Sequence, residues 1–302
     1  MNRFVVGPDW GWAIVIYFYL GGIAAGAYAV ASMVGLWGDE DDRRAVRVAH
    51  YLAFPLVSLC GLLLIVDLNR PERFWHMMIQ SQTGRPMLKW WSPMSAGSWG
   101  LSAFGAFSFA SFLGALAEDR RWPMARWAVR AARLRRGPLG KLFGMAGTLT
   151  AFFLGAYTGT LLSATNQPVW ADTAWLSPLF LASALATGVA AMTLLERWFL
   201  RDTPAAAHRR LGRVETWSVA MEGVLLVVFA GSLGRLAPEA FLRWPGLLIP
   251  AVVVPASLIL PLAARRLRGR WAPIVAAASV LAGGLALRYA VVGMPGPLLL
   301  GS

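Results

Sequence analysis

Long apolar runs recur along the whole chain, separated by short polar segments. Each run is roughly 20 residues long, which is what an α-helix needs to cross about 30 Å of hydrocarbon at 1.5 Å per residue. The pattern therefore predicts an all-α, polytopic membrane protein of about eight transmembrane helices, arranged as two four-helix bundles in one domain, 1–302. The predicted helices cover 13–36, 48–67, 93–117, 143–164, 174–198, 214–234, 246–264 and 273–293.

The composition supports this class. Of 302 residues, 57% are hydrophobic and only 14% are charged, whereas soluble domains average about 25% charged residues. A net charge of +13 could indicate a nucleic-acid partner. However, the basic residues lie in short loops between apolar runs, where membrane proteins carry them. We therefore expect membrane lipid, and no nucleic acid, as a partner.

The basic residues divide unevenly between alternate loops. Most of the 28 Lys and Arg residues follow the first, third, fifth and seventh predicted helices. Because cytoplasmic loops carry the excess of Lys and Arg, we expect these loops in the cytoplasm of a bacterial cell, with the chain in the inner membrane and both termini on the outer, periplasmic side. The segment after the second helix then faces outward.

Cysteine and histidine content limits the redox groups that the chain could hold. Cys60 is the only cysteine, and iron–sulfur clusters or structural zinc need several thiolates. A membrane haem needs two axial ligands that face each other, but His50, His76 and His208 are scattered over one helix start and two loops. We expect no haem, no iron–sulfur cluster and no metal in this chain.

Ionisable side chains at membrane depth are costly, so they are candidates for function. Glu222 and Arg288 lie inside the sixth and eighth predicted helices, and Glu196 and Glu215 lie near cytoplasmic helix ends. These four residues could form a proton path. Alternatively, Glu222 is a buried partner of an arginine or of a backbone group, Arg288 forms an ion pair, and the other two acids are ordinary solvated or Arg-paired carboxylates.

Small residues mark the first and fourth predicted helices. Gly22 and Gly26 are four apart, a spacing typical of close helix contact in lipid. Gly155 and Gly159 repeat this spacing on either side of Tyr157. A buried tyrosine hydroxyl needs a hydrogen-bond partner. The two glycines either serve helix packing alone or also leave room beside the hydroxyl for a ligand.

Several stretches, spread over most of the chain, occur in an order shared with a known family. They are Tyr19-Leu20-Gly21-Gly22-Ile23-Ala24-Ala25-Gly26-Ala27, Asp67-Leu68-Asn69-Arg70-Pro71-Glu72-Arg73-Phe74-Trp75-His76, Ser92-Pro93-Met94-Ser95, Tyr157-Thr158-Gly159 with Pro168-Val169-Trp170, and Gly283-Gly284 with Leu287-Arg288-Tyr289. Together they resemble the polysulfide reductase membrane-subunit family, also called NrfD-like. The family more often has glycine at the position of Asn69, and asparagine tolerates a left-handed backbone better than most residues.

The resemblance implies a haem-free membrane anchor of a multi-subunit oxidoreductase, which exchanges electrons between membrane quinone or menaquinone and a ferredoxin-like iron–sulfur subunit on the outer face. Through that subunit it would serve a molybdopterin oxidoreductase or another electron carrier. The quinone would lie near the outer ends of the second to fourth helices. Tyr157 would hydrogen-bond one carbonyl oxygen, Asp67 or His76 would exchange the proton, Arg70 would orient Asp67, and Trp75 would wall the pocket.

Two other functions remain open at this point. A secondary transporter is built from paired bundles with broken helices, and it would move its substrate without partner subunits. A purely structural anchor would bind the same partners but would have no quinone site. As an anchor, the chain would not act on the terminal substrate by itself.

Overall fold

The computed structural model describes residues 10–37, 43–119, 137–199, 205–264, 266, 269 and 271–296. The long helices of its first half are α1 Trp12–Trp37, α2 Arg43–Val66, α3 Pro93–Asp119 and α5 Gly137–Ser163. Those of its second half are α6 Leu176–Phe199, α7 Ala205–Ser232, the π-helix η4 Ile249–Ile259 with its continuation α9 Leu260–Ala264, and α10 Ala272–Gly293. Short helices η2 Pro71–Met77, η3 Gly234–Leu236 and α8 Ala237–Leu242 lie in the connections.

Of the described helices, seven are long and apolar enough to cross a membrane. The predicted all-α, polytopic membrane class is therefore confirmed. The span expected at 246–264 is different from the other seven, because Ile249–Ala264 is shorter and mostly π-helical. Proline has no N–H to donate and its ring clashes with the preceding turn, so Pro250 and Pro255 account for the irregular backbone of this segment.

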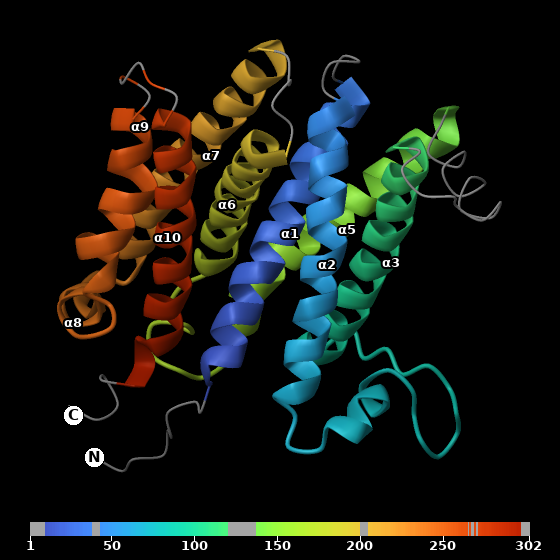
Figure 1. Ribbon diagram of the computed structural model, residues 1–302. Coiled ribbons are helices and arrows are strands. Elements are labelled where there is room, and N and C mark those ends of the chain that lie inside the picture. Colours follow the sequence, from blue (N-terminus) through green and yellow to red (C-terminus); the bar gives the residue numbers. More distant parts are fainter. Residues whose placement is uncertain are drawn as a thin grey trace, which may run out of the picture.

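The helices form two bundles side by side, as predicted (Figure 1). In the first bundle, α1 packs on α2, α2 on α3, α3 on α5, and α5 back on α1. In the second bundle, α6 packs on α7, α7 on η4, η4 on α10, and α10 on α6. Helices α1 and α5 join the bundles by packing against α6.

Glycines bring α1 and α6 into backbone contact. A Cβ atom at Gly26 would overlap the main chain of Ala184, and one at Gly188 would overlap the main chain at Gly26 and Ala27. Close approach of this kind is the main source of helix association in lipid, where burial of apolar surface between helices gains little. The close contact predicted from the spacing of the α1 glycines is present.

One end of the molecule carries the segment 67–92, which includes η2, and we call this end the motif face. Helix α1 begins and α10 ends at this same end, which is the lower one in Figure 1. The opposite face carries the end of α1 and the start of α5. The assignment of the motif face to the periplasm stays a prediction.

Several helices extend beyond the predicted spans. Helix α5 begins at Gly137 and α7 at Ala205, six and nine residues before the predicted starts at 143 and 214. Hydropathy marks the part of a helix that lies in lipid, whereas the backbone hydrogen bonds continue into the polar residues before it. The helices η2, η3 and α8 were missed because they are only three to seven residues long, too short for a hydropathy pattern to mark them.

Candidate functional site

Asp67 and Arg70 lie at the start of the segment that follows α2. Both side chains are exposed, and no ion pair of the described residues joins them, so the expected pairing of Arg70 with Asp67 is not seen. Pro71 begins η2, because its fixed φ suits the first helical position, where an N–H would be unpaired anyway. Asp67 directly follows α2, where its N–H donates to the Leu63 carbonyl at 2.9 Å, and Arg70 is the residue before η2.

Trp75 and His76 form an aromatic pair in the same helix. Their ring centroids are 3.8 Å apart and the planes are 23° from parallel. His76 Nδ1 lies 3.1 Å from the Arg73 carbonyl oxygen. Because a carbonyl oxygen only accepts, Nδ1 carries the proton in this hydrogen bond and Nε2 is left as the acceptor. Stacking and one hydrogen bond thus orient the imidazole, and its second nitrogen can exchange a proton.

Hydrogen bonds fix the rest of the segment 67–92 on the first two turns of α3. The Met87 N–H donates to the Met78 carbonyl at 2.8 Å. The Lys89 N–H donates to the Ser95 hydroxyl at 3.0 Å, and Trp99 Nε1 donates to the Met87 carbonyl at 3.1 Å. The segment is therefore a fixed part of the motif face.

Tyr157 of α5 is buried below the start of α3, with 6% of its surface exposed. Its hydroxyl donates to the Pro93 carbonyl oxygen at 2.8 Å. The ring lies over Gly97, where any Cβ atom would overlap it, and it stacks on Phe153 at a centroid distance of 5.5 Å. The hydroxyl proton is committed to Pro93, but the hydroxyl oxygen can still accept a hydrogen bond.

Of the two roles open to the glycines beside Tyr157, helix packing is the one that the structure supports. A Cβ atom at Gly155 would contact Leu181 and Ala184 of α6, and one at Gly159 would overlap the backbone of α6 at its start. They allow α5 and α6 to approach and do not open a space beside the tyrosine. The space that Tyr157 occupies comes from Gly97 on α3.

Sequence reasoning missed Tyr17 of α1. It is 3% exposed, and its hydroxyl lies within electrostatic reach of Tyr157 and Cys60. No described residue forms a hydrogen bond with this hydroxyl, although a buried tyrosine normally has a partner. Tyr17 and Gly21 are one helical turn apart, and this spacing is the signal that the sequence offered. In the structure, the side of α1 that carries both residues meets Cys60.

The predicted quinone residues share one face but do not form one contact cluster. No described hydrogen bond or ring contact joins Tyr157 to Asp67, Arg70, Trp75 or His76. The tyrosine is buried within the first bundle, whereas Asp67, Arg70 and Trp75 are exposed on the segment at its end. The motif face thus combines buried hydroxyls with charged and imidazole side chains nearer its surface.

Arg288 lies at the junction of the two bundles and is 1% exposed. Its Nε donates to the Phe18 carbonyl at 3.1 Å, and Nη1 donates to the Ser183 hydroxyl at 3.0 Å and to the Gly284 carbonyl at 2.8 Å. Gly22 leaves the room that the guanidinium needs. One arginine therefore ties α1, α6 and α10 together.

Glu222 of α7 is fully buried and interacts electrostatically with Arg288. The structure contains no direct ion pair between them, and neither carboxyl oxygen of Glu222 has a hydrogen-bond partner among the described residues. The Ser183 hydroxyl, which accepts from Arg288, lies close to this carboxyl group. The buried acid and the buried base thus attract each other through space, beside a shared serine.

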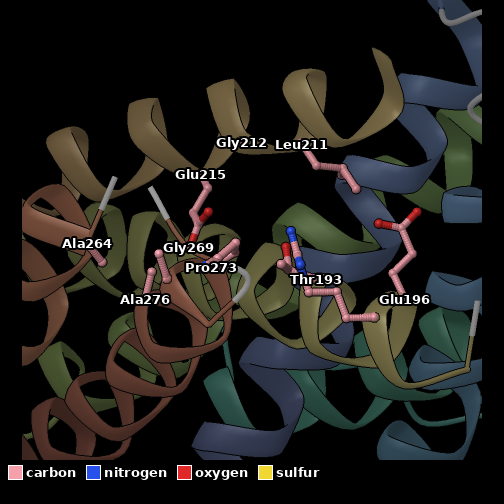
Figure 2. Close-up of a pocket in the computed structure, with 11 residues that line it drawn as sticks. Thr193, Glu196, Leu211, Gly212, Glu215, Ala264, Gly269, Pro273 and Ala276 are labelled. Atoms are coloured by element: carbon pink, nitrogen blue, oxygen red, sulfur yellow. The ribbon is translucent and has the colours of Figure 1, made fainter. Parts of the chain in front are cut away.

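Glu196 and Glu215 meet at a cavity of about 250 Å³ in the second bundle. Figure 2 shows Glu196 and Thr193 on α6 and Glu215 on α7 among the side chains that line it. Both carboxylates are buried. Glu215 precedes Glu222 by seven residues on the same helix, which is about 10.5 Å along its axis. Of the four predicted proton-path residues, two therefore line this cavity and two lie deeper.

Another part of the family-like pattern holds the fold together. Trp170 is fully buried, and its Nε1 donates to the Val291 carbonyl of α10 at 2.7 Å. Val169 has a φ of 71°, and its N–H donates to Asp172 Oδ2 at 2.9 Å. Val169 is the only non-glycine residue with a positive φ in the described ranges, so Asn69 does not have a left-handed backbone.

The fold and these sites define a polytopic helical membrane protein with buried ionisable and hydroxyl groups in its interior. The family model for polysulphide reductase, NrfD, matches residues 5–296. The chain therefore belongs to this family, and the resemblance found in its sequence is confirmed.

Three relatives show how far the similarity extends. A polysulfide reductase chain of Wolinella succinogenes is 27% identical, over 93% of this protein and 92% of the relative. A selenate reductase subunit of Mesobacillus selenatarsenatis is 25% identical, over 72% of this protein and 55% of the relative, so the match spans about half of that subunit. Protein NrfD of Escherichia coli is 28% identical, over 73% and 70%. Two of the three are named as one component of a reductase.

Proposed function

We propose that this chain is the quinone-interacting membrane subunit of a multi-subunit oxidoreductase in a bacterial inner membrane. The observation that supports it most is the buried Tyr157 hydroxyl, which lies at the motif face, behind the segment that carries Asp67 and His76. Membership of a family whose relatives are named as reductase subunits agrees with this proposal.

In this proposal, the motif face binds the quinone headgroup. A quinol that is oxidised to a quinone releases two electrons and two protons. The Tyr157 oxygen accepts a hydrogen bond from one quinol hydroxyl while its own proton stays in the hydrogen bond to Pro93. His76 Nε2 or the Asp67 carboxylate accepts the proton that accompanies each electron and passes it on before the second is released, and imidazole suits this exchange near neutral pH. Trp75 covers the pocket.

The electrons pass to a ferredoxin-like iron–sulfur subunit, and through it to a molybdopterin oxidoreductase or another electron carrier. That subunit docks on the motif face, where the exposed segment 67–92 offers a fixed surface close to the quinone. In the opposite direction of flow, the same groups donate protons to a quinone that is being reduced. The terminal substrate is handled by another subunit of the complex.

The buried acids of the second bundle extend this proposal to proton movement. Arg288 lies between the two bundles, and Glu222 is near it. The cavity lined by Glu196 and Glu215 lies about two helical turns from Glu222. Protons would move between the cavity and Glu222. In proteoliposomes of the intact complex, Glu222→Gln should abolish proton movement and leave electron transfer from quinol intact, whereas Glu239→Gln on the exposed helix α8 should change neither. Undiminished proton movement in Glu222→Gln would remove Glu222 from the path.

The irregular helix η4 is the one feature that favours a secondary transporter, since such proteins use broken helices. Purification of the tagged chain in mild detergent separates the alternatives. We expect an iron–sulfur subunit and bound quinone to copurify with it, and Tyr157→Phe to lower quinone-linked turnover while the complex stays assembled. A lone chain without quinone, active in substrate uptake, would establish the transporter. Partners without any quinone would establish a purely structural anchor.

A further inference from the structure

A second cavity lies in the first bundle, at the opposite face from the candidate quinone site. Its volume is about 110 Å³, several times the share of one water molecule, which is about 30 Å³. The helices α1, α2, α3 and α5 all contribute to its wall. Its polar lining comprises Tyr28, Ser32, His50, Ser111 and Lys141.

Ser32 points to a ligand in this cavity. The residue is 8% exposed, and no described residue forms a hydrogen bond with its hydroxyl. Other helical serines, such as Ser58 and Ser98, return the hydroxyl to a carbonyl one turn earlier, at 2.9 Å in each case. The Ser32 oxygen is not one of the fully enclosed unpaired atoms of the described residues, so it is open to the cavity that the residue lines and can donate a hydrogen bond to a ligand there.

The lining favours an anion. Helix α5 is 27 residues long and begins at Gly137, so its first N–H groups and the positive end of its dipole lie at this face. Lys141 lines the cavity from the same part of α5, and the described lining residues include no aspartate or glutamate. A helix N-terminus beside a lysine and a hydroxyl donor is the arrangement that binds phosphate in many proteins.

The remaining wall is polar and rigid. The Tyr28 and Ser111 hydroxyls are hydrogen-bonded to each other at 3.0 Å, and the Tyr28 ring meets His50 edge-on at a centroid distance of 5.2 Å. Gly147 gives Tyr28 its room, since a Cβ atom there would overlap the tyrosine. These contacts fix the part of the wall that α1, α2 and α3 contribute.

We propose that this cavity binds a phosphate group, held by Ser32, Lys141 and the first turn of α5. A phosphate has several acceptor oxygens in a tetrahedral arrangement, so donors from α1 and α5 can reach different oxygens at once. The group can belong to a phospholipid headgroup or to a soluble phosphate. This binding is independent of the quinone chemistry at the motif face.

The test is ligand-induced stabilisation of the full-length chain in detergent, because a ligand that binds only the folded state raises the unfolding temperature. One arm adds inorganic phosphate against chloride at equal ionic strength. The other arm adds phosphatidylglycerol against diacylglycerol, which lacks the phosphate. The variants are Ser32→Ala and Lys141→Gln, and the controls are Ser58→Ala and Lys89→Gln, which lie away from the cavity. Each shift is measured relative to the same variant without ligand, so a loss of stability by itself does not count.

We expect a phosphate-dependent shift in the wild-type chain and in both controls. Ser32→Ala and Lys141→Gln should each weaken the apparent affinity about tenfold, as expected for loss of one hydrogen bond to a charged group. Stabilisation mainly by phosphatidylglycerol identifies a lipid headgroup, and stabilisation mainly by inorganic phosphate identifies a soluble anion. No phosphate-dependent shift in either arm, or equal shifts in the variants and the controls, would overturn the proposal.

Discussion

The motif face of the first bundle and the interior of the second bundle house their charged groups in opposite ways. Asp67 and Arg70 are exposed and make no ion pair with each other. Glu222 and Arg288 are completely enclosed, and the arginine uses three hydrogen bonds to hold its place. The charges at the motif face are in contact with solvent, whereas those of the interior are isolated from it by the packed helices.

This difference separates two kinds of role. Removing an exposed charge leaves nothing buried without a partner, so it should affect chemistry more than folding. Removing one member of a buried pair leaves the other in a low-dielectric interior, which is strongly unfavourable. Measurements of stability and of turnover on matched variants should therefore give opposite rankings for the two regions.

The largest effect on stability is expected for Arg288→Met. The change leaves Glu222 without its counter-charge and removes the donors to Phe18 and Gly284, so it should lower the free energy of unfolding by about 3–5 kcal/mol. The matched change Arg70→Met at the motif face should alter it by no more than about 0.5 kcal/mol. Denaturation of the purified proteins in detergent measures both.

A second substitution sharpens this comparison. Adding Glu222→Gln to Arg288→Met removes the stranded acid, so the double variant should regain part of the lost stability. Equal stability of the wild-type chain and Arg288→Met, or no recovery in the double variant, would show that the two groups are not coupled.

The next effect is on turnover at the motif face. A positioned acid–base group contributes about 10²–10⁴-fold to rate, so His76→Gln should lower quinone-linked turnover by about 10²-fold if His76 exchanges the proton, with unfolding unchanged. Added imidazole should then restore part of the rate. If Asp67 exchanges the proton, Asp67→Asn shows this loss and His76→Gln does not. Full turnover in both variants would remove proton exchange from the segment 67–92.

The smallest effect is expected at Gly97. The change Gly97→Ala puts a methyl group where the Tyr157 ring lies, and overpacking of this kind costs about 1–3 kcal/mol. It should also lower quinone-linked turnover, because the hydroxyl leaves Pro93. Gly105→Ala on the same helix meets no atom within 4 Å and serves as the control. The same loss in both variants would indicate a general effect of α3 on stability rather than displacement of Tyr157.

The helices were predictable because each must satisfy its own backbone in lipid and expose apolar side chains. A close helix contact of α1 was also predictable from the spacing of Gly22 and Gly26, whereas its partner, α6, was not. The π-helix at 249–259 was not. Prolines indicate a disturbed helix, but whether the backbone kinks or widens depends on the neighbours that accept the freed groups.

For the sites too, the burial of a residue was predictable, whereas its neighbours from other helices were not. Burial of Glu222 and Arg288 followed from their positions inside apolar runs. Ser183, which lies close to both charged groups, comes from a different helix, α6. The environment of Tyr157 depends on Gly97, 60 residues earlier in the chain. The glycines on either side of Tyr157 are four residues apart, so they lie on one side of α5. That side meets α6, and no local sequence pattern indicates which helix it would meet.

The quinone site at the motif face is tested most directly by photo-crosslinking. A photoreactive quinone analogue is bound to the intact complex in its membrane, irradiated, and located by mass spectrometry of the digested chain. We expect label on the segment 67–99 and on α5 around Tyr157, with both signals lost when excess quinone competes. Label confined to the second bundle, or to the Glu196–Glu215 cavity, would contradict a quinone site at the motif face.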